Sequence, residues 1–177
     1  MYKSRLVRPI AKMRKIGIPY LLMLASFQVL ALEKDRTAIA KLGADSADLN
    51  QQTHQGSYKG NVQFDQGTTH LRANEAITIG NEENKLTFAK ALGTEKEPAH
   101  FWTQTDDNKP PLHAYALEIH YYAEKHLIVL IGNARVEQGE DSLAAPKITY
   151  DTEKKHVVTY GNKKLRTTII FHSGKKT

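Results

Sequence analysis

One stretch of the chain occurs twice, and this repetition constrains the fold more than any other feature of the sequence. The segment GNVQFDQG at 60–67 returns as GNARVEQG at 132–139. A leucine and an alanine follow at the same offset, so that six of fourteen positions are identical. Similarity at a fixed offset is typical of a chain built from structurally equivalent units.

Around these segments, apolar and polar residues alternate with a period of two. Leu117, Ile119 and Tyr121, for example, alternate with Glu118 and His120. This alternation is typical of strands with one buried face, and short polar turns separate the segments. At about nine residues for each strand and its turn, the sequence predicts an all-β protein with about sixteen short strands in two facing sheets.

The same alternation predicts which side chains face the interior. We expect this inner face to be apolar and to carry an apolar ligand. The inward residues read from the alternation are Val62, Phe64, Ile77, Ile79, Phe88, Leu117, Ile119 and Tyr121.

The N-terminal segment has the organisation of a secretory signal peptide. A basic stretch, with no acidic residue before Glu33, precedes an apolar run from Ile16 to Leu30. The run has the length of a signal-peptide core and is short for a membrane-spanning helix. We therefore predict a signal peptide at 1–31 and one exported domain at 32–177; an uncleaved N-terminal anchor is the alternative.

Removal of this segment changes the charge balance. Its six charges are all basic, which leaves 19 Lys and Arg against 19 Asp and Glu in the remainder. The net charge of +6 therefore belongs to the targeting segment, and we predict no nucleic-acid binding. The chain also has no cysteine, which excludes disulfides and a lipid-modified cysteine at the cleavage site. These features predict the periplasm of a Gram-negative bacterium; a generic secreted protein is the alternative.

The sequence offers little support for catalysis. Eight histidines are present, but none form His-x-x-x-His or His-Glu-x-x-His, and Gly-x-Ser-x-Gly is absent. Asp106 and Asp107 lie in a proline-bounded loop, where carboxylates are commonly solvated. We predict a protein that is not an enzyme and that uses no metal and no cofactor.

The segment Leu165 to Phe171 (LRTTIIF) predicts the last strand. A terminal strand has an edge of unpaired backbone groups, which can pair with another chain by strand addition. The residues expected in such a partner strand are Leu165, Thr167, Ile169 and Phe171. The alternative is that Arg166 and the basic tail protect this edge from aggregation.

Several short stretches follow the order and spacing of one known family. They are GNV at 60–62, QG at 66–67, KEPAHF at 96–101, DNKP at 107–110, HA at 113–114, HY at 120–121, LIGNA at 130–134, KITY at 147–150 and RTT at 166–168. On these stretches the chain resembles the OstA-like β-jellyroll family of periplasmic lipopolysaccharide-transport proteins.

The resemblance implies an open, twisted jellyroll whose apolar interior holds the acyl chains of lipopolysaccharide between the two membranes. It implies partners at both ends: an LptC-like component of the inner-membrane transport complex, an LptD-like outer-membrane translocon, and further copies of the chain. The contact positions of the family correspond to Leu42, Phe101 and Tyr121. Ile39 joins this set, although its strand departs from the family by carrying Lys41.

A ligand-free structural scaffold of the cell envelope, assembled by strand addition, is the alternative. A solid core and an open interior have the same apolar inward residues, so the sequence does not separate the two. The aromatic pair Phe101-Trp102 precedes the longest loop. We expect Trp102 to anchor this loop in the core and Phe101 to line the interior.

Overall fold

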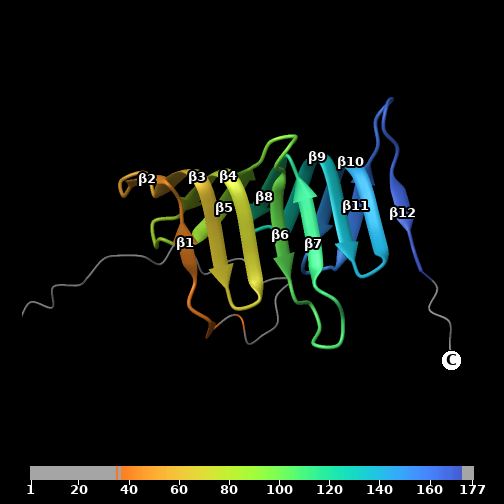
Figure 1. Ribbon diagram of the computed structural model, residues 1–177. Helices are drawn as coiled ribbons and strands as arrows, with labels where there is room; N and C mark the ends of the chain where they lie inside the picture. The colour runs from red at the N-terminus through yellow and green to blue at the C-terminus, as the bar shows by residue number, and fades with distance from the viewer. Residues whose placement is uncertain (1–34, 36, 173–177) are drawn as a thin grey trace, which may run out of the picture.

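The computed structural model describes residues 35 and 37–172, so the predicted signal peptide lies outside the described residues. This part of the chain consists of strands and loops (Figure 1). The strands are β1 (Lys41–Gly43), β2 (Ser46–Asn50), β3 (Gln55–Gln66), β4 (Thr69–Gly80), β5 (Leu86–Leu92), β6 (Ala99–Thr103), β7 (Leu112–Ala116), β8 (Glu118–Tyr122), β9 (Leu127–Gln138), β10 (Asp141–Asp151), β11 (His156–Tyr160) and β12 (Thr168–Ile170). Within the same residues, no helix has the length and apolarity needed to span a membrane.

Four long strands, β3, β4, β9 and β10, each belong to two layers. The first half of β3 pairs with β2 and with the end of β4, whereas its second half pairs with β1 and with the start of β4. β9 pairs in the same way with β8 and β7. One antiparallel sheet is thereby folded over into two facing layers, with β1 and β12 at opposite ends of the row (Figure 1).

We name the layers sheet I and sheet II. Sheet I runs β1, second half of β3, first half of β4, β6, β7, second half of β9, first half of β10, β12. Sheet II runs β2, first half of β3, second half of β4, β5, β8, first half of β9, second half of β10, β11. Each layer therefore has eight strand segments in the described residues. The predicted all-β jellyroll of two facing antiparallel sheets with about sixteen short strands is confirmed.

The repeat seen in the sequence is a repeat of the whole strand arrangement. When the residue numbers of β2 and β3 are increased by the offset that relates the two repeated segments, they give the residue numbers of β8 and β9. The pairing pattern of β1 to β6 is also the same as that of β7 to β12. We call β1 to β6 the first repeat and β7 to β12 the second repeat, and we call residues aligned when this offset relates them. The two repeats join through the β6–β7 pair in sheet I and the β5–β8 pair in sheet II.

The repeated Gly-Asn pair forms the corner at which a long strand passes from one sheet to the other. The φ angles are 75° and 48° at Gly60 and Asn61, and 79° and 48° at Gly132 and Asn133. Glycine and asparagine adopt this left-handed region at the lowest cost. At the first corner the β3–β4 register shifts between Lys59 and Val62, which bends the strand.

The repeated Gln-Gly pair ends each long strand in a similar way. The Nε2 atom of Gln66 donates a hydrogen bond to the carbonyl of Ala38 (3.2 Å), and that of Gln138 donates one to the carbonyl of Pro110 (3.0 Å). The two acceptor residues are themselves aligned. Each glutamine therefore holds the segment before the first strand of its repeat, β1 or β7, against the end of the long strand, β3 or β9.

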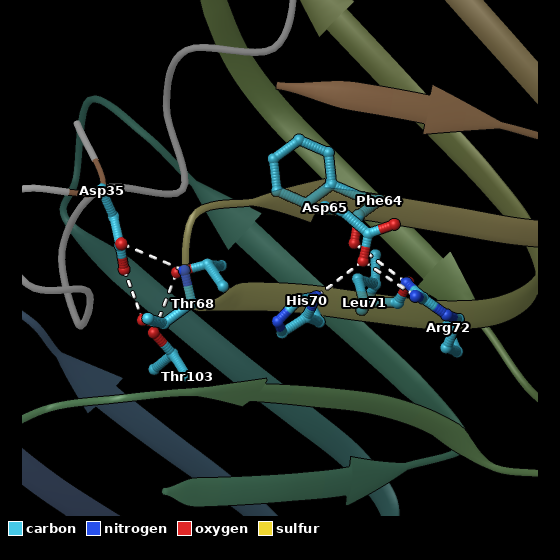
Figure 2. Close-up of polar contacts among 9 residues, drawn as sticks. Asp35, Phe64, Asp65, Thr68, His70, Leu71, Arg72 and Thr103 are labelled. Atoms are coloured by element: carbon cyan, nitrogen blue, oxygen red, sulfur yellow. Dashed lines mark hydrogen bonds and ion pairs between the residues drawn. The ribbon is translucent and has the colours of Figure 1, made fainter. Parts of the chain in front are cut away.

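The hairpin turn of the first repeat is closed by Asp35. Its carboxylate accepts hydrogen bonds from the backbone N–H of Thr68 (3.0 Å) and from the Thr68 hydroxyl (2.5 Å), as Figure 2 shows. Beside them, the buried hydroxyls of Thr69 and Thr103 are 2.8 Å apart. This network covers the side of the first repeat that lies opposite its corner.

The predicted last strand is only partly present. β12 covers three residues, Thr168 to Ile170, and pairs with β10 alone. Asn162 holds the preceding segment in a turn, because its Oδ1 accepts hydrogen bonds from the backbone N–H groups of Lys164 and Leu165. The predicted strand over 165–171 was therefore too long.

Candidate ligand-binding cavity

An apolar cavity of about 520 Å³ lies between the two sheets in the second repeat. This volume is within the range of about 300–1,000 Å³ found for small-ligand sites. Its walls come from both sheets. The aromatic and aliphatic side chains in these walls include Phe101, Ile119, Tyr121, Leu130, Val136 and Ile148.

Aligned interior side chains of sheet I differ in size between the two repeats. At three aligned interior positions, the second repeat has the smaller residue. The pairs are Leu42 and Ala114, Val62 and Ala134, and Phe64 and Val136. These three smaller side chains leave more space beside the cavity on the side of sheet I, whereas in sheet II Ala76 is matched by the larger Ile148.

The interior of the first repeat is more tightly packed. A cavity of about 20 Å³ lies there, bordered by Leu42, Phe64 and Leu71. Phe64 is 1% exposed and belongs to the main buried cluster of the protein. The two repeats thus share a fold but differ in internal space.

The charged residues that line the cavity lie in two short segments at its edge. Thr105, Asp106 and Lys109 come from the loop between β6 and β7, and Lys155 comes from the turn between β10 and β11. The loop is held by Gln104, whose Nε2 donates to the carbonyls of Asp106 and Lys109. These segments are hairpin ends of the two sheets, on the side away from the corners.

Six predicted interior residues are buried or partly buried between the sheets. Phe101, Ile119 and Tyr121 line the large cavity. Leu42, Val62 and Phe64 pack in the first repeat. Burial raises the pKa of the Tyr121 hydroxyl, and the residue forms part of the cavity wall.

The inward orientation predicted for Ile77, Ile79 and Phe88 is wrong. Ile77 and Ile79 alternate with buried Ala76 and Thr78, and Phe88 packs on the outer face against the rings of His120 and Tyr122. Alternation separates the two faces of a strand but does not say which face is inside. In β4 and β5 the smaller residues face inward, because two sheets have to approach each other there.

Two further interior predictions are also wrong. Ile39 precedes β1 and is 80% exposed. Leu117 lies at the corner between β7 and β8, where its side chain fills the space beside Gly132; a Cβ on that glycine would be 2.8 Å from the Leu117 Cδ1. The corner breaks the alternation that Leu117 was expected to share with Ile119.

Trp102 does not anchor the loop in the core. It lies on the outer face of sheet I, because its neighbour Phe101 points inward. There the rings of His70, Trp102, His100 and Tyr115 stack in succession with centroid separations of 4.8, 4.5 and 4.2 Å. The guanidinium groups of Arg72 and Arg135 lie over the Trp102 and Tyr115 rings.

Charged groups on this outer face are paired. Partial burial would raise the pKa of Asp65, but hydrogen bonds from His70 and Arg72 outweigh it and lower the pKa (Figure 2). The described residues contain no group of three or more His, Asp or Glu side chains arranged to hold a metal ion.

Sequence reasoning missed Leu130, Val136 and Ile148, which line the cavity, and Lys109 and Lys155 at its edge. The repeat itself could have located one of these positions, because Val136 is aligned with Phe64, which was predicted to face inward. Ile148 is aligned with Ala76, and the wrong inward assignment of Ile77 in β4 hid this position.

A folded-over antiparallel sheet with an apolar cavity between its layers defines a β-jellyroll with a candidate interior binding site. The family comparison agrees with this fold. The chain belongs to the family described as LptA/(LptD N-terminal domain) LPS transport protein, which it matches over residues 41–156.

Individual relatives and one solved structure support the same family. The lipopolysaccharide export system protein LptH of Pseudomonas aeruginosa is 31% identical over 134 residues, which are 76% of this chain and 75% of LptH. The lipopolysaccharide export system protein LptA of Escherichia coli K12 is 28% identical over 151 residues, 84% of this chain and 79% of LptA. The crystal structure of LptH, described as a periplasmic component of the lipopolysaccharide transport device, matches with a TM-score of 0.68 at 26% identity and covers 78% of this chain and 99% of that one.

Proposed function

We propose that this protein binds lipopolysaccharide through its acyl chains and transfers it across the periplasm as part of a bridge between the inner and outer membranes. The observation that carries this proposal is the apolar cavity of the second repeat. The relatives are named as lipopolysaccharide export proteins, which supports the same ligand.

The energetics of an acyl chain explain why an interior site suits this task. Each methylene moved from water to an apolar site gains about 0.8 kcal/mol, so a chain of about a dozen carbons is strongly excluded from water. A site between two sheets removes the chain from water on both sides. Transfer between similar interior sites then needs little net free energy for each step.

The ends of the sheets support a bridge built by strand addition. At the N-terminal end β1 and β2 each have one paired neighbour among the described strands, and at the C-terminal end β11 and β12 do. Exposed apolar side chains mark both ends: Leu49 is 58% exposed, Val157 45% and Ile169 52%. An LptC-like partner at one end, an LptD-like partner at the other and further copies between them would cover these edges.

Photo-crosslinking from two adjacent tyrosine positions tests the binding site. Tyr121 lines the cavity, whereas Tyr122 lies on the outer face against Phe88. With a photoreactive phenylalanine at each position in turn, we expect a lipopolysaccharide adduct from position 121 and none from position 122. Adducts of equal yield would indicate adhesion to the surface and would exclude the interior site.

A filled cavity provides the second arm of this test. Val136→Phe copies the residue that already fills the first repeat at the aligned position, Phe64. We expect this variant to fold and to lose saturable binding of a fluorescent lipid that lipopolysaccharide displaces from the wild type. If the wild-type protein itself shows no saturable binding, the ligand-free scaffold is the correct description.

A further inference from the structure

We propose that Lys109 and Lys155 form an anion-binding rim for the phosphate groups of the amphiphile whose acyl chains occupy the cavity. This inference rests on the proposed function and specifies which end of the ligand lies at the cavity edge. Both lysines border the cavity, Lys109 from the loop between β6 and β7 and Lys155 from the turn between β10 and β11.

The backbone holds both lysines in place. The carbonyl of Lys109 accepts a hydrogen bond from Gln104, and the adjacent carbonyl of Pro110 accepts one from Gln138. The turn that carries Lys155 is tied to the neighbouring hairpin, because the hydroxyl of Thr152 donates to the carbonyl of His126 (2.8 Å). The two ammonium groups therefore come from fixed hairpin ends of the two sheets, although their side chains reach solvent.

Neither ammonium group forms an ion pair with another described residue. By comparison, Lys154, next to Lys155, pairs with Asp151 at 2.9 Å. The carboxylate that shares the cavity edge, Asp106, accepts a hydrogen bond from the backbone N–H of Asn108. Among the charged residues that line the cavity, two are thus cationic and one is a carboxylate, which favours an anionic ligand group there.

The first repeat provides an internal comparison. At the position aligned with Lys109 it has Thr37. In the turn between β4 and β5, which corresponds to the turn that carries Lys155, its lysine, Lys85, pairs with Glu83 at 2.6 Å. The first repeat therefore has no lysine at the first position, and the lysine of its turn is already in an ion pair. Cationic groups and internal space occur together in the second repeat, as expected if the acyl chains and the anionic head belong to one ligand.

The test compares phosphorylated and neutral probes on the full domain. Displacement of a fluorescent fatty-acid methyl ester is measured with bisphosphorylated lipid A, with its monophosphorylated form and with unlabelled methyl ester. The proteins are the wild type, Lys109→Gln, Lys155→Gln, the double variant and the control Lys96→Gln, an exposed lysine in the loop between β5 and β6.

We expect the double variant to bind bisphosphorylated lipid A about tenfold more weakly, each single variant to lose about threefold, and the methyl ester to bind as before. The difference should shrink at high salt, because exposed charges are screened. Wild-type affinity of the double variant for bisphosphorylated lipid A, or equal losses for the methyl ester, would overturn the anionic rim while leaving interior binding intact. Absence of lipid binding by the wild type would overturn the proposed function and this inference together.

Discussion

At the residue scale, His100 on the outer face of sheet I is held in one protonation state by its surroundings. Its ring stacks against Trp102 and Tyr115, and its Nε2 lies 3.0 Å from the Nδ1 of His113. Burial, and then the charges of His113, Arg72 and Arg135, lower the pKa of His100 from 6.5 to about 4. The neutral imidazole is therefore the form that the folded protein favours.

This shift predicts a loss of stability on acidification. Below pH 6.5 the unfolded chain takes up a proton at His100 that the folded protein does not, so the free energy of unfolding falls as the pH drops towards 4. We expect the melting temperature to fall between pH 7 and 4.5, and to fall less in His100→Gln than in the wild type. His156→Gln, at an exposed position of β11, is the control and should retain the wild-type slope. Parallel curves for His100→Gln and the wild type would contradict this assignment.

The corner of each long strand sets the geometry of the element. Gly60 has a φ of +75°, and a Cβ there would lie 2.3 Å from the Asp45 Oδ2. Asp45 is itself fixed, because its backbone N–H donates to the carbonyl of Gly60 and its carboxylate accepts from the side chain of Asn61. Backbone conformation and side-chain space thus both require glycine at this corner.

Alanine substitution at two glycines tests whether the corner specifically requires glycine or whether any glycine in a strand has the same effect on stability. We expect Gly60→Ala to lower the free energy of unfolding by about 1–3 kcal/mol, since a non-glycine residue is strained in this region. Gly43→Ala in β1 is the matched control, because a Cβ there meets no atom within 4 Å. Its effect should stay within about 0.5 kcal/mol in urea unfolding. A loss of similar size in both variants would argue against the corner as the cause.

At the scale of the molecule, the junction between the repeats predicts a register for the proposed contact between copies. Phe101 of β6 pairs with Ala114 of β7 across this junction. Ile169 of β12 is the counterpart of Phe101, because Ile169 pairs with Leu143 whereas Phe101 pairs with the aligned leucine, Leu71. Leu42 of β1 is aligned with Ala114 in the same way. A copy added to the C-terminal end in the same way would therefore pair its Leu42 with Ile169.

Cysteine crosslinking checks this register in a chain that has no cysteine of its own. Directly paired residues of antiparallel strands have Cα atoms about 4.5–5.5 Å apart, which suits a disulfide. We expect a mixture of the Ile169→Cys and Leu42→Cys variants to form a crosslinked dimer under mild oxidation. Ile169→Cys mixed with Leu49→Cys, in the other sheet, should not. Crosslinking in both mixtures would mean nonspecific contact.

The sequence predicts the architecture well because both the repeat and the alternation can be read directly from the order of the residues. The constant offset between the repeated segments and the period of two were enough for two facing sheets and about sixteen strands. The inner face was harder to assign, as Ile77, Ile79 and Phe88 illustrate, because it depends on the register shifts at the corners and on how closely the sheets approach. The location of the cavity depends on differences between aligned residues, such as Phe64 and Val136, and these gain meaning only once the two repeats are superposed.

If the proposed bridge contains a row of copies, the tightly packed first repeat has a consequence for the speed of transport. Because Phe64 and its neighbours occupy the interior of every first repeat, open and closed compartments would alternate along the row. Cargo would then advance in discrete steps, one for each copy, and would pause in each second repeat. The rate would depend on how often the closed compartments rearrange rather than on diffusion along an uninterrupted channel.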